Sequence, residues 1–372
     1  MTSQTDPLGS TTYFSYDNLN RLLVRTEPDP DGSGAGASPA TTFTYNAINS
    51  LTSLTDPVGN MTSWTLDNLQ RVTSETNELD DTRSWIYDAA SNVTKATDRN
   101  GRIREFTFDG LNRITQEQWK NGTTVVNTIT QSFDAASQLL STSDDSSELS
   151  FTYDNLGRVT SIDNDGTPDV PNVVLTNTFD AASRRTALSA TIDETLDFLN
   201  SYSYDNLGRM TQVTQQGQED GHDVAEKRVD LTYHPNGQFS TLTRYADLDA
   251  TALVATTTYS FDQSNRLTAL SHDQGSTNLA SYSWTFDASS RINAATTPDG
   301  TATYSYDNNG QLTAADHSAQ TDESYSYDAN GNRAMSGYTT GTNNRLTSDG
   351  TYDYEYDGRE KVSGREKVSG TK

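Results

Sequence analysis

The sequence predicts an all-β protein in which repeated antiparallel β-hairpins form a spiralling ribbon or a partial hollow β-shell. Three observations support this fold class: a short motif recurs fifteen times, nearly every copy carries two aromatic residues at alternate positions, and turn residues bound each copy. The copies extend over residues 1–358, which we interpret as a single repeat domain. Residues 359–372 follow as a tail, which we expect to be disordered or a scar at a gene boundary.

The repeated motif is aromatic-x-aromatic-Asp-x-x-Gly/Asn/Ser-Arg, and the ring directly before the aspartate is its anchor. Successive anchors lie 20 to 29 residues apart, so a basic unit of 21 residues carries loop insertions of varying length. A period in this range is typical of a repeat architecture. The fifteen anchors are Tyr16, Tyr45, Leu66, Tyr87, Phe108, Phe133, Tyr153, Phe179, Tyr204, Tyr233, Phe261, Phe286, Tyr306, Tyr327 and Tyr356.

The aromatic residues concentrate at two positions of the unit. Fourteen anchors are aromatic and the position two residues earlier is aromatic in twelve units, which together hold 26 of the 34 rings. A separation of two places both rings on one face of a strand, and the intervening Ser and Thr residues suit a wetter face. We expect rings of successive hairpins to stack in a ladder, so that Tyr204→Ala lowers the melting temperature.

Turn residues stand at both ends of each unit. The residue after the anchor is Asp in thirteen of fifteen units, and an Asp at the head of a turn accepts backbone N–H bonds two residues on. A following glycine, such as Gly237, supplies a positive φ. A second turn, seen at Thr5–Gly9 and Thr55–Gly59, closes the unit seven residues before the next anchor. Each unit is therefore predicted to be a β-hairpin.

An arginine stands at the fifth position after eight of the anchors. We expect each one to bond the turn aspartate of its own or the adjacent hairpin, which would make a ladder of charge-assisted hydrogen bonds. We assign structural roles to the following residues of the repeat: Tyr16, Asp17, Tyr87, Asp88, Tyr153, Asp154, Gly157, Arg158, Tyr204, Asp205, Gly208, Arg209, Tyr306, Asp307, Tyr327 and Asp328.

Fifteen hairpins correspond to about thirty strands, and at about 4.8 Å between neighbours one sheet would be about 140 Å wide. Twisted open sheets seldom exceed about ten strands without curling. No break in composition divides the chain into separate domains. A continuous ribbon is therefore predicted to coil into a spiral or shell.

The composition excludes several classes of function. The formal net charge of −25 argues against nucleic acid or an anionic membrane surface as a partner. The absence of cysteine excludes disulfides, thiol catalysis and Cys-ligated metals. Only 32% of residues are hydrophobic, no run is long enough to span a membrane, and Met1–Pro7 does not resemble a signal peptide. A coiled single sheet needs few apolar residues because it has no thick core.

The motif resembles that of the YD-repeat or Rhs family, as in Tyr153-Asp154 with Gly157-Arg158 and in Tyr327-Asp328 with Gly331. The family includes bacterial Rhs polymorphic toxins, shell proteins of insecticidal toxin complexes, and teneurins. The resemblance implies a β-ribbon wound into a hollow shell, which in the toxin members encloses a C-terminal effector. It implies that this chain is a non-catalytic shell fragment of a larger secreted or surface protein, extracellular or at the cell surface, whose partner is the rest of that polypeptide or the effector.

The chain departs from the toxin members at its C-terminus. No core segment with an aspartate-dependent cleavage site follows the repeats, and Arg359–Gly364 is duplicated as Arg365–Gly370. Both ends therefore look cut from a longer ribbon. Because open edge strands invite pairing with another chain, we expect self-association through the sheet edges.

No motif indicates catalysis or a bound cofactor. The four histidines form no metal-binding or triad spacing, so we predict no enzymatic activity. One metal hypothesis remains: Asp163, Asp165 and Asp169 follow the spacing of a calcium loop. The segment Asp29-Pro30-Asp31-Gly32 matches that spacing less well. No bidentate glutamate stands at the far end of the loop, and we favour an ordinary solvated turn over a calcium site.

The alternative function is an adhesin-like module that binds carbohydrate or a protein partner at the cell surface. Exposed rings can stack on sugars, and Trp119 and Tyr245 lie outside the anchor pattern. Saturable binding on a glycan array would favour this alternative, whereas an empty curved shell in electron micrographs would favour encapsulation.

Overall fold

The computed structural model of the chain describes residues 2–7, 9–29, 38–341, 345–356 and 362–367. All regular elements in these ranges are antiparallel β-strands, which confirms the predicted fold class. The strands are β1 Ser3–Thr5, β2 Thr11–Tyr16, β3 Leu22–Thr26, β4 Ala40–Tyr45, β5 Leu51–Thr55, β6 Met61–Leu66, β7 Val72–Thr76, β8 Thr82–Tyr87, β9 Val93–Thr97, β10 Arg102–Phe108, β11 Ile114–Asn121, β12 Thr124–Phe133, β13 Leu139–Asp144, β14 Ser147–Tyr153, β15 Val159–Asp163, β16 Val173–Phe179, β17 Arg185–Ile192, β18 Thr195–Tyr204, β19 Met210–Gly217, β20 Lys227–Tyr233, β21 Phe239–Tyr245, β22 Leu253–Phe261, β23 Leu267–Gln274, β24 Thr277–Phe286, β25 Ile292–Thr297, β26 Gly300–Tyr306, β27 Leu312–His317, β28 Glu323–Ser324, β29 Tyr338–Gly341, β30 Arg345–Asp349, β31 Tyr352–Tyr356 and β32 Val362–Lys367.

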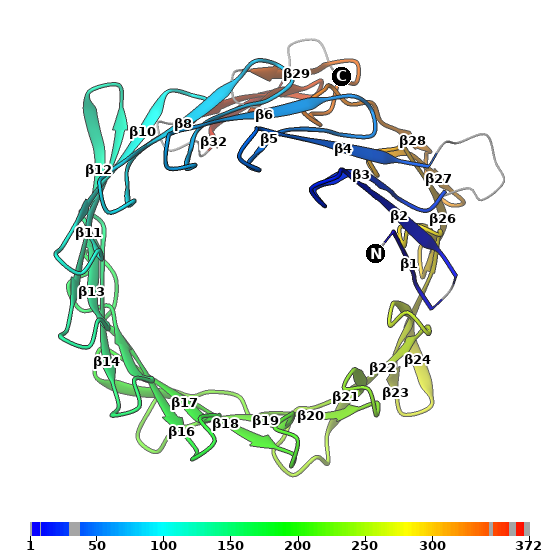
Figure 1. Cartoon of the computed structure of the whole chain (residues 1–372). Helices are drawn as coiled ribbons and strands as arrows, with labels where there is room; N and C mark the ends of the chain where they lie inside the picture. Colours follow the sequence, from blue (N-terminus) through cyan, green and yellow to red (C-terminus); the bar gives the residue numbers. More distant parts are fainter. Residues whose placement is uncertain (1, 8, 30–37, 342–344, 357–361, 368–372) are drawn as a thin grey trace.

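The first 28 strands form one sheet in which each strand pairs with the next along the chain, and β29 to β32 form a second, four-stranded sheet. Viewed along its axis, the large sheet curls into a ring (Figure 1). Because each strand of the large sheet pairs antiparallel with the next along the chain, the predicted succession of hairpins is confirmed. The ring is a partial hollow β-shell made of a single layer.

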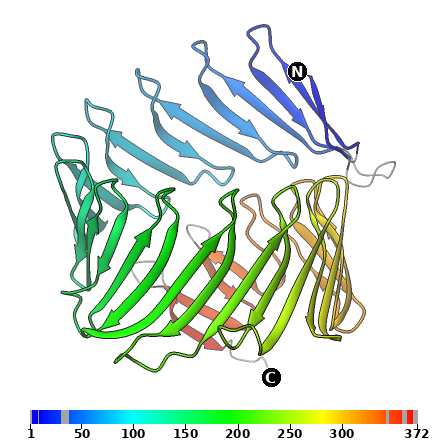
Figure 2. The same cartoon turned by 90° about the horizontal axis from the view of Figure 1, so that it is seen from below.

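The ring does not close strand to strand but continues as a spiral, with the N-terminal strands lying above its later strands (Figure 2). Two side-chain hydrogen bonds join the overlapping ends: the Ser289 hydroxyl donates to the Pro28 carbonyl at 3.2 Å, and Asn309 Nδ2 donates to Asp56 Oδ2 at 2.8 Å. The first bond links the loop after β3 with the turn after β24, and the second links the turn after β5 with the turn after β26. We call this contact the seam. One turn of the spiral therefore takes 21 strands.

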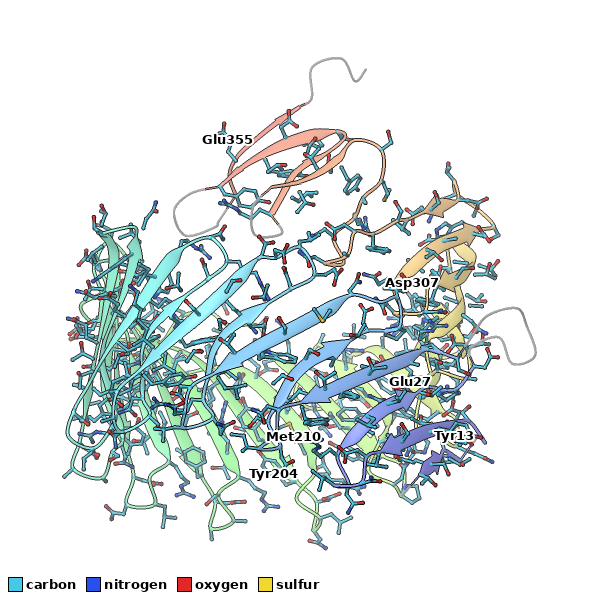
Figure 3. The ribbon with its side chains drawn as sticks, turned by 45° about the horizontal axis from the view of Figure 1, so that its top comes forward. Tyr13, Glu27, Tyr204, Met210, Asp307 and Glu355 are labelled. Atoms are coloured by element: carbon cyan, nitrogen blue, oxygen red, sulfur yellow. The ribbon has the colours of Figure 1, made fainter. Side chains whose placement is uncertain are left out.

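A β-bulge in each unit accounts for the curvature. The pairing shifts directly before the anchor, so that Ser203 pairs with Gln212 but Tyr204 pairs with Met210, which leaves Thr211 unpaired. Figure 3 labels Tyr204 and Met210 on the ribbon. The same shift occurs at fourteen of the fifteen anchors. A bulge bends its strand and increases the local twist. Repeated along the sheet, these bulges turn a long ribbon into a ring.

The two faces of the sheet differ as the alternation predicts. On the ring face, which carries the anchor rings, Tyr202 and Tyr204 are half-buried, whereas Ser203 on the opposite face is exposed. Hydroxyl groups bond across strands on that opposite face, as between Ser132 and Ser141 at 2.6 Å. Among the described residues, seven are buried, and all of them are small or of moderate size: Pro39, Ala190, Ala255, Thr257, Ala295, Ala302 and Ala315. The expected absence of a thick core thus holds over the described ranges.

The C-terminal tail is described only in part. Val362–Lys367 forms β32 and pairs with β31, and residues 359–361 and 368–372 lie outside the described residues. Residues 30–32 of the Asp29–Gly32 segment also lie outside them. Within the described ranges there is no helix of the length and apolarity that a membrane span requires.

Candidate functional site

The repeated turn is organised by its aspartate. In the unit of Tyr204, Asp205 Oδ1 accepts hydrogen bonds from the backbone N–H groups of Leu207 and Arg209, both at 2.9 Å. Its other oxygen, Oδ2, accepts a bond from Arg209 Nε at 2.7 Å. The bonds from the backbone and guanidinium of Arg209 hold the pKa of Asp205 below its usual value, although desolvation opposes them. The same pairing of the turn aspartate with the arginine four residues on recurs at Asp17, Asp67, Asp109, Asp154, Asp180, Asp262 and Asp287.

The residue before the arginine takes a left-handed conformation. Gly208 has a φ of 78°, and Asn20, Asn112 and Asn265 have φ values of 61°, 61° and 64° at the same place in their turns. Glycine adopts this conformation without strain, and asparagine tolerates it better than other side chains. The Gly/Asn/Ser alternation of the motif is thus a backbone requirement.

Replacement of Gly208 tests this requirement. Gly208→Asn is expected to leave stability nearly unchanged, because no atom lies within 4 Å of the new Cβ position. Gly208→Val is expected to lower the free energy of unfolding by about 1–2 kcal/mol, because a β-branched residue is strained at positive φ. Thermal melts of the two variants would check the difference, and equal melting temperatures would contradict it.

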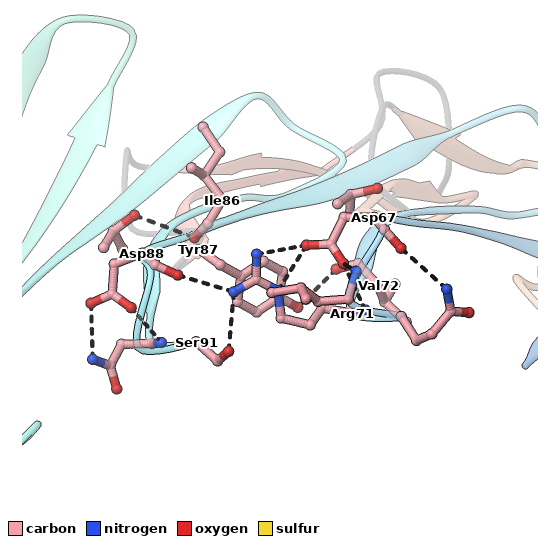
Figure 4. A network of polar contacts seen from close by, with 12 residues as sticks. Asp67, Arg71, Val72, Ile86, Tyr87, Asp88 and Ser91 are labelled. Carbon is pink, nitrogen blue, oxygen red and sulfur yellow. Dashed lines mark hydrogen bonds and ion pairs between the residues drawn. The ribbon is translucent and has the colours of Figure 1, made fainter.

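In the eight units that carry it, the arginine also joins the unit to the next one (Figure 4). Arg71 pairs with Asp67 of its own turn at 2.6 Å, and its Nη1 donates to the Asp88 carbonyl of the following turn at 3.0 Å. Its guanidinium lies 4.5 Å from the centre of the Tyr87 ring, and the Tyr87 hydroxyl donates back to the Val72 carbonyl at 2.8 Å. The predicted arginine ladder is confirmed. Equivalent arginine–ring pairs are Arg21–Tyr45, Arg113–Phe133, Arg158–Phe179, Arg184–Tyr204, Arg209–Tyr233, Arg266–Phe286 and Arg291–Tyr306.

The predicted ladder of stacked rings is wrong for most of the sheet. Within the described ranges, ring–ring contacts occur only between β20 and β24, as in Tyr233–Phe239 and Tyr282–Trp284. Successive anchors are two strands apart, about 9.6 Å, whereas rings in contact have centres about 4.5–7 Å apart. The arginine side chain fills that gap, so cation–π contacts take the place of ring stacking.

The calcium hypothesis finds no matching geometry. Asp163 Oδ1 accepts bonds from the Asp165 backbone N–H at 2.8 Å and from Asn172 Nδ2 at 2.9 Å, as expected of an ordinary turn. Asp169 lies further along the loop with a φ of 59°. In the part of the chain that the structure describes, no three His, Cys, Asp or Glu side chains gather where they could hold a metal. The three aspartates are therefore not brought together as metal ligands.

A cavity of about 490 Å³ lies on the ring face across β8 to β12. Cross-strand pairing places Trp85 opposite Ala96, Ala96 opposite Arg104, and Arg104 opposite Trp119. These four residues form one row across four strands, and all four line the cavity together with Arg83. The small Ala96 lies between larger neighbours, which hollows the surface at that point. The sequence indicated only Trp119, as a ring outside the repeat.

Comparisons with known proteins agree with this architecture. The family model described as teneurin YD-shell matches residues 236–368, and the model described as RHS repeat matches residues 1–33 and 87–124. Comparison with curated protein sequences finds no match.

Solved structures of Tc toxin proteins share the fold. A chain of the Photorhabdus luminescens Tc holotoxin pore, determined with a TccC3 variant, superposes with a TM-score of 0.74 at 12% identity over 99% of this chain and 22% of its own. A crystal structure of TcdB2–TccC3 gives a TM-score of 0.66 at 13% identity, over 94% of this chain and 23% of its own. The crystal structure described as TcdB2–TccC3–TEV gives a TM-score of 0.67 at 12% identity, over 98% of this chain and 22% of its own. The chain thus spans about a fifth of the length of these relatives.

Proposed function

Because the chain is a YD-repeat protein of the Rhs type, we propose that it is a non-catalytic structural shell which encloses an effector segment of a larger secreted or surface protein. The observation that carries the proposal is the seam, where a 28-stranded ribbon overlaps itself after one spiral turn. A ribbon that served only to display loops would have no need to close on itself. The partner in this proposal is the rest of the parent polypeptide.

The bonding pattern of the wall supports a container that stands without cargo. In the eight units that carry the arginine, its guanidinium pairs with the aspartate of its own turn and reaches the next turn through a backbone hydrogen bond and a ring contact, as seen at Arg71. These contacts repeat along the ribbon and involve no residue outside it. Such nearest-neighbour stabilisation is typical of repeat proteins.

Electron microscopy of the purified chain tests the shell. We expect curved or ring-shaped particles with an empty centre, and a compact particle without a cavity would contradict the shell proposal.

Encapsulation is tested by limited proteolysis of the full reading frame that contains the chain. The effector segment should be protected while attached to the intact shell and cleaved once the shell is unfolded; cleavage at equal rates would contradict enclosure.

The seam gives a prediction of its own. The double variant Ser289→Ala, Asn309→Ala removes both side-chain donors that bridge the overlapping ends, so its particles should show a wider or open seam in class averages. Asn155→Ala, at an exposed turn position without a seam contact, is the matched control. Indistinguishable closure in the double variant and the control would show that these bonds do not hold the seam.

One observation favours the adhesin-like alternative as a second candidate. The cavity between Trp85 and Trp119 combines two indole rings with guanidinium groups, which are side chains that sugar-binding sites use. A glycan array distinguishes the two candidates, because a shell that only encloses cargo would bind no glycan specifically.

A further inference from the structure

We propose that two copies of the chain pair through one rim of the ring, so that a row of exposed apolar side chains on one copy packs against the same row on the other. The surface concerned is the anchor rim, which we define as the turns directly after the anchors from Tyr16 to Tyr306. These anchors end the even-numbered strands β2 to β26. Because successive turns of the sheet alternate between its two rims, all of these turns lie on the same rim (Figure 2). The inference does not depend on whether the shell encloses cargo.

The third residue after the anchor changes character along this rim. In the first nine units it is apolar, Leu or Ile in six and Ala in three, whereas in the next five units it is Asn or Ser. All nine apolar residues are exposed. The six large side chains are 61–77% exposed: Leu19, Ile48, Leu69, Leu111, Leu156 and Leu207. A single exposed leucine is normal on a protein surface, but a regular row on one rim indicates an interaction surface.

The change from apolar to polar coincides with the seam. Ser289 and Asn309, the two donors of the seam hydrogen bonds, are the third residues after their anchors. Ser264 occupies the same position in its unit and lines a cavity together with Asp6 and Pro7 of the overlapping N-terminal turn. The position is therefore polar and half-buried where the ribbon itself covers the anchor rim, and it is apolar in nine units where the residue is exposed.

The opposite rim does not suit the leucines as a partner. At the seam it presents oxygen acceptors, the Pro28 carbonyl and the Asp56 carboxylate, to polar donors. Leucine has no donor, so in the same contact such acceptors would lose water without gaining a hydrogen bond. The opposite rim also carries exposed acidic turn residues such as Asp145 and Glu194. A row of leucines is matched instead by another row of leucines, which the anchor rim of a second copy supplies.

The row of apolar residues matches itself when its direction is reversed. A twofold axis through the fifth unit, perpendicular to the spiral axis, maps the path of the rim onto itself, so two rims can meet along their whole free length. The pairs across the contact are Leu19–Leu207, Ile48–Ala182, Leu69–Leu156, Ala90–Ala136 and Leu111–Leu111. Apart from Ile48–Ala182, each pair joins side chains of equal size. Such an isologous contact closes as a dimer and does not grow into a filament.

The free part of the rim has the area that a stable dimer needs. Nine turns spaced two strands apart extend over about 77 Å, since neighbouring strands lie about 4.8 Å apart. With a width of about 10 Å, the thickness of one sheet layer, this strip presents about 770 Å². A standard protein interface buries about 800 Å² per partner. The row therefore offers enough area for a specific contact without the edge strands β1 and β28.

Sedimentation velocity of the purified chain over a range of concentrations tests the proposal. We expect a monomer–dimer equilibrium that shifts toward the dimer as the salt concentration rises, because salt screens the repulsion between two chains of net charge −25. Leu111→Asp sets two carboxylates against each other at the twofold axis, so it should raise the dissociation constant about a hundredfold or more. Leu69→Lys and Leu156→Glu should each weaken the dimer. The double variant should recover it, because a lysine then faces a glutamate in both symmetry-related pairs.

Leu79→Asp is the matched control, because Leu79 is an exposed leucine in a turn of the opposite rim. It should dimerise as the parent chain does, and all variants should melt as the parent does because the substituted side chains are exposed. The proposal is overturned if the parent sediments as a monomer at every concentration, if Leu111→Asp leaves the dimer unchanged, or if Leu79→Asp dissociates it equally. Binding of a monomeric parent to phosphatidylcholine vesicles, lost in Leu111→Asp, would also overturn it, in favour of a lipid surface as the occupant.

Discussion

Tyr204→Ala is expected to lower the free energy of unfolding by about 2 kcal/mol. The substitution removes a half-buried ring that lies 4.8 Å from the Arg184 guanidinium, and it removes the hydroxyl that donates to the Arg185 carbonyl at 2.7 Å. Truncation of a fully buried ring costs about 3–5 kcal/mol, and a ring open on one side costs less. Chemical denaturation followed by circular dichroism would measure the change.

Tyr204→Phe separates the two contributions. It keeps the ring beneath Arg184 and removes only the hydrogen bond to Arg185, so it should cost about 1 kcal/mol. If Tyr204→Ala and Tyr204→Phe are equally stable, the cation–π contact contributes nothing. Unchanged stability of both would contradict the proposal that rings link successive units.

Acidification below about pH 4 is expected to unfold the chain over a narrow range of pH. Hydrogen bonds from the following arginine hold the pKa values of the turn carboxyls below the usual 3.8. The guanidinium of the arginine has the largest effect on the pKa of Asp154, and the backbone N–H has the largest effect on the pKa of Asp205. A carboxyl whose pKa is lowered by folding contributes stability that is fully present above pH 3.8. This contribution is lost as the pH falls through the lower pKa of the folded state. The residues concerned are Asp17, Asp67, Asp109, Asp154, Asp180, Asp205 and Asp262.

Melting temperatures from pH 7 down to pH 2.5 would check this expectation. The melting temperature should change little between pH 7 and 5 and then fall steeply, because equivalent groups in many units titrate together. Asp154→Asn removes one of these carboxylates, so it should melt lower than the parent at pH 7 and lose less on acidification. A parent melting temperature that stays constant from pH 6 to pH 3 would contradict a stabilising role for the turn aspartates.

The local structure could be predicted because it is encoded within single units. Asp154 and Arg158 are four residues apart in one turn, and Phe151 and Tyr153 are two apart in one strand, so spacing alone places their side chains. Positive φ at Gly157 follows from the turn type in the same way. The hairpins, the two faces and the arginine ladder were therefore accessible from the sequence.

The ring ladder was mispredicted because the sequence does not show how far apart successive anchors lie in space. Arg158 lies 4.7 Å from the Phe179 ring of the next unit, and this contact replaces a ring neighbour. Spacing also cannot show whether Asp163, Asp165 and Asp169 turn toward one point, and the calcium site stays a prediction.

The sequence by itself determined that this protein is a coiled ribbon of hairpins, because every contact that defines a hairpin lies within about 30 residues. Only the tertiary structure decided the size of the ring, the seam and the cavity. A small bend at each bulge accumulates over 21 strands before Asn309 meets Asp56, which is 253 residues away in the chain. The row from Trp85 to Trp119 likewise exists only once four strands pair in register. Neither depends on a local pattern, so neither could be predicted from the spacing of residues.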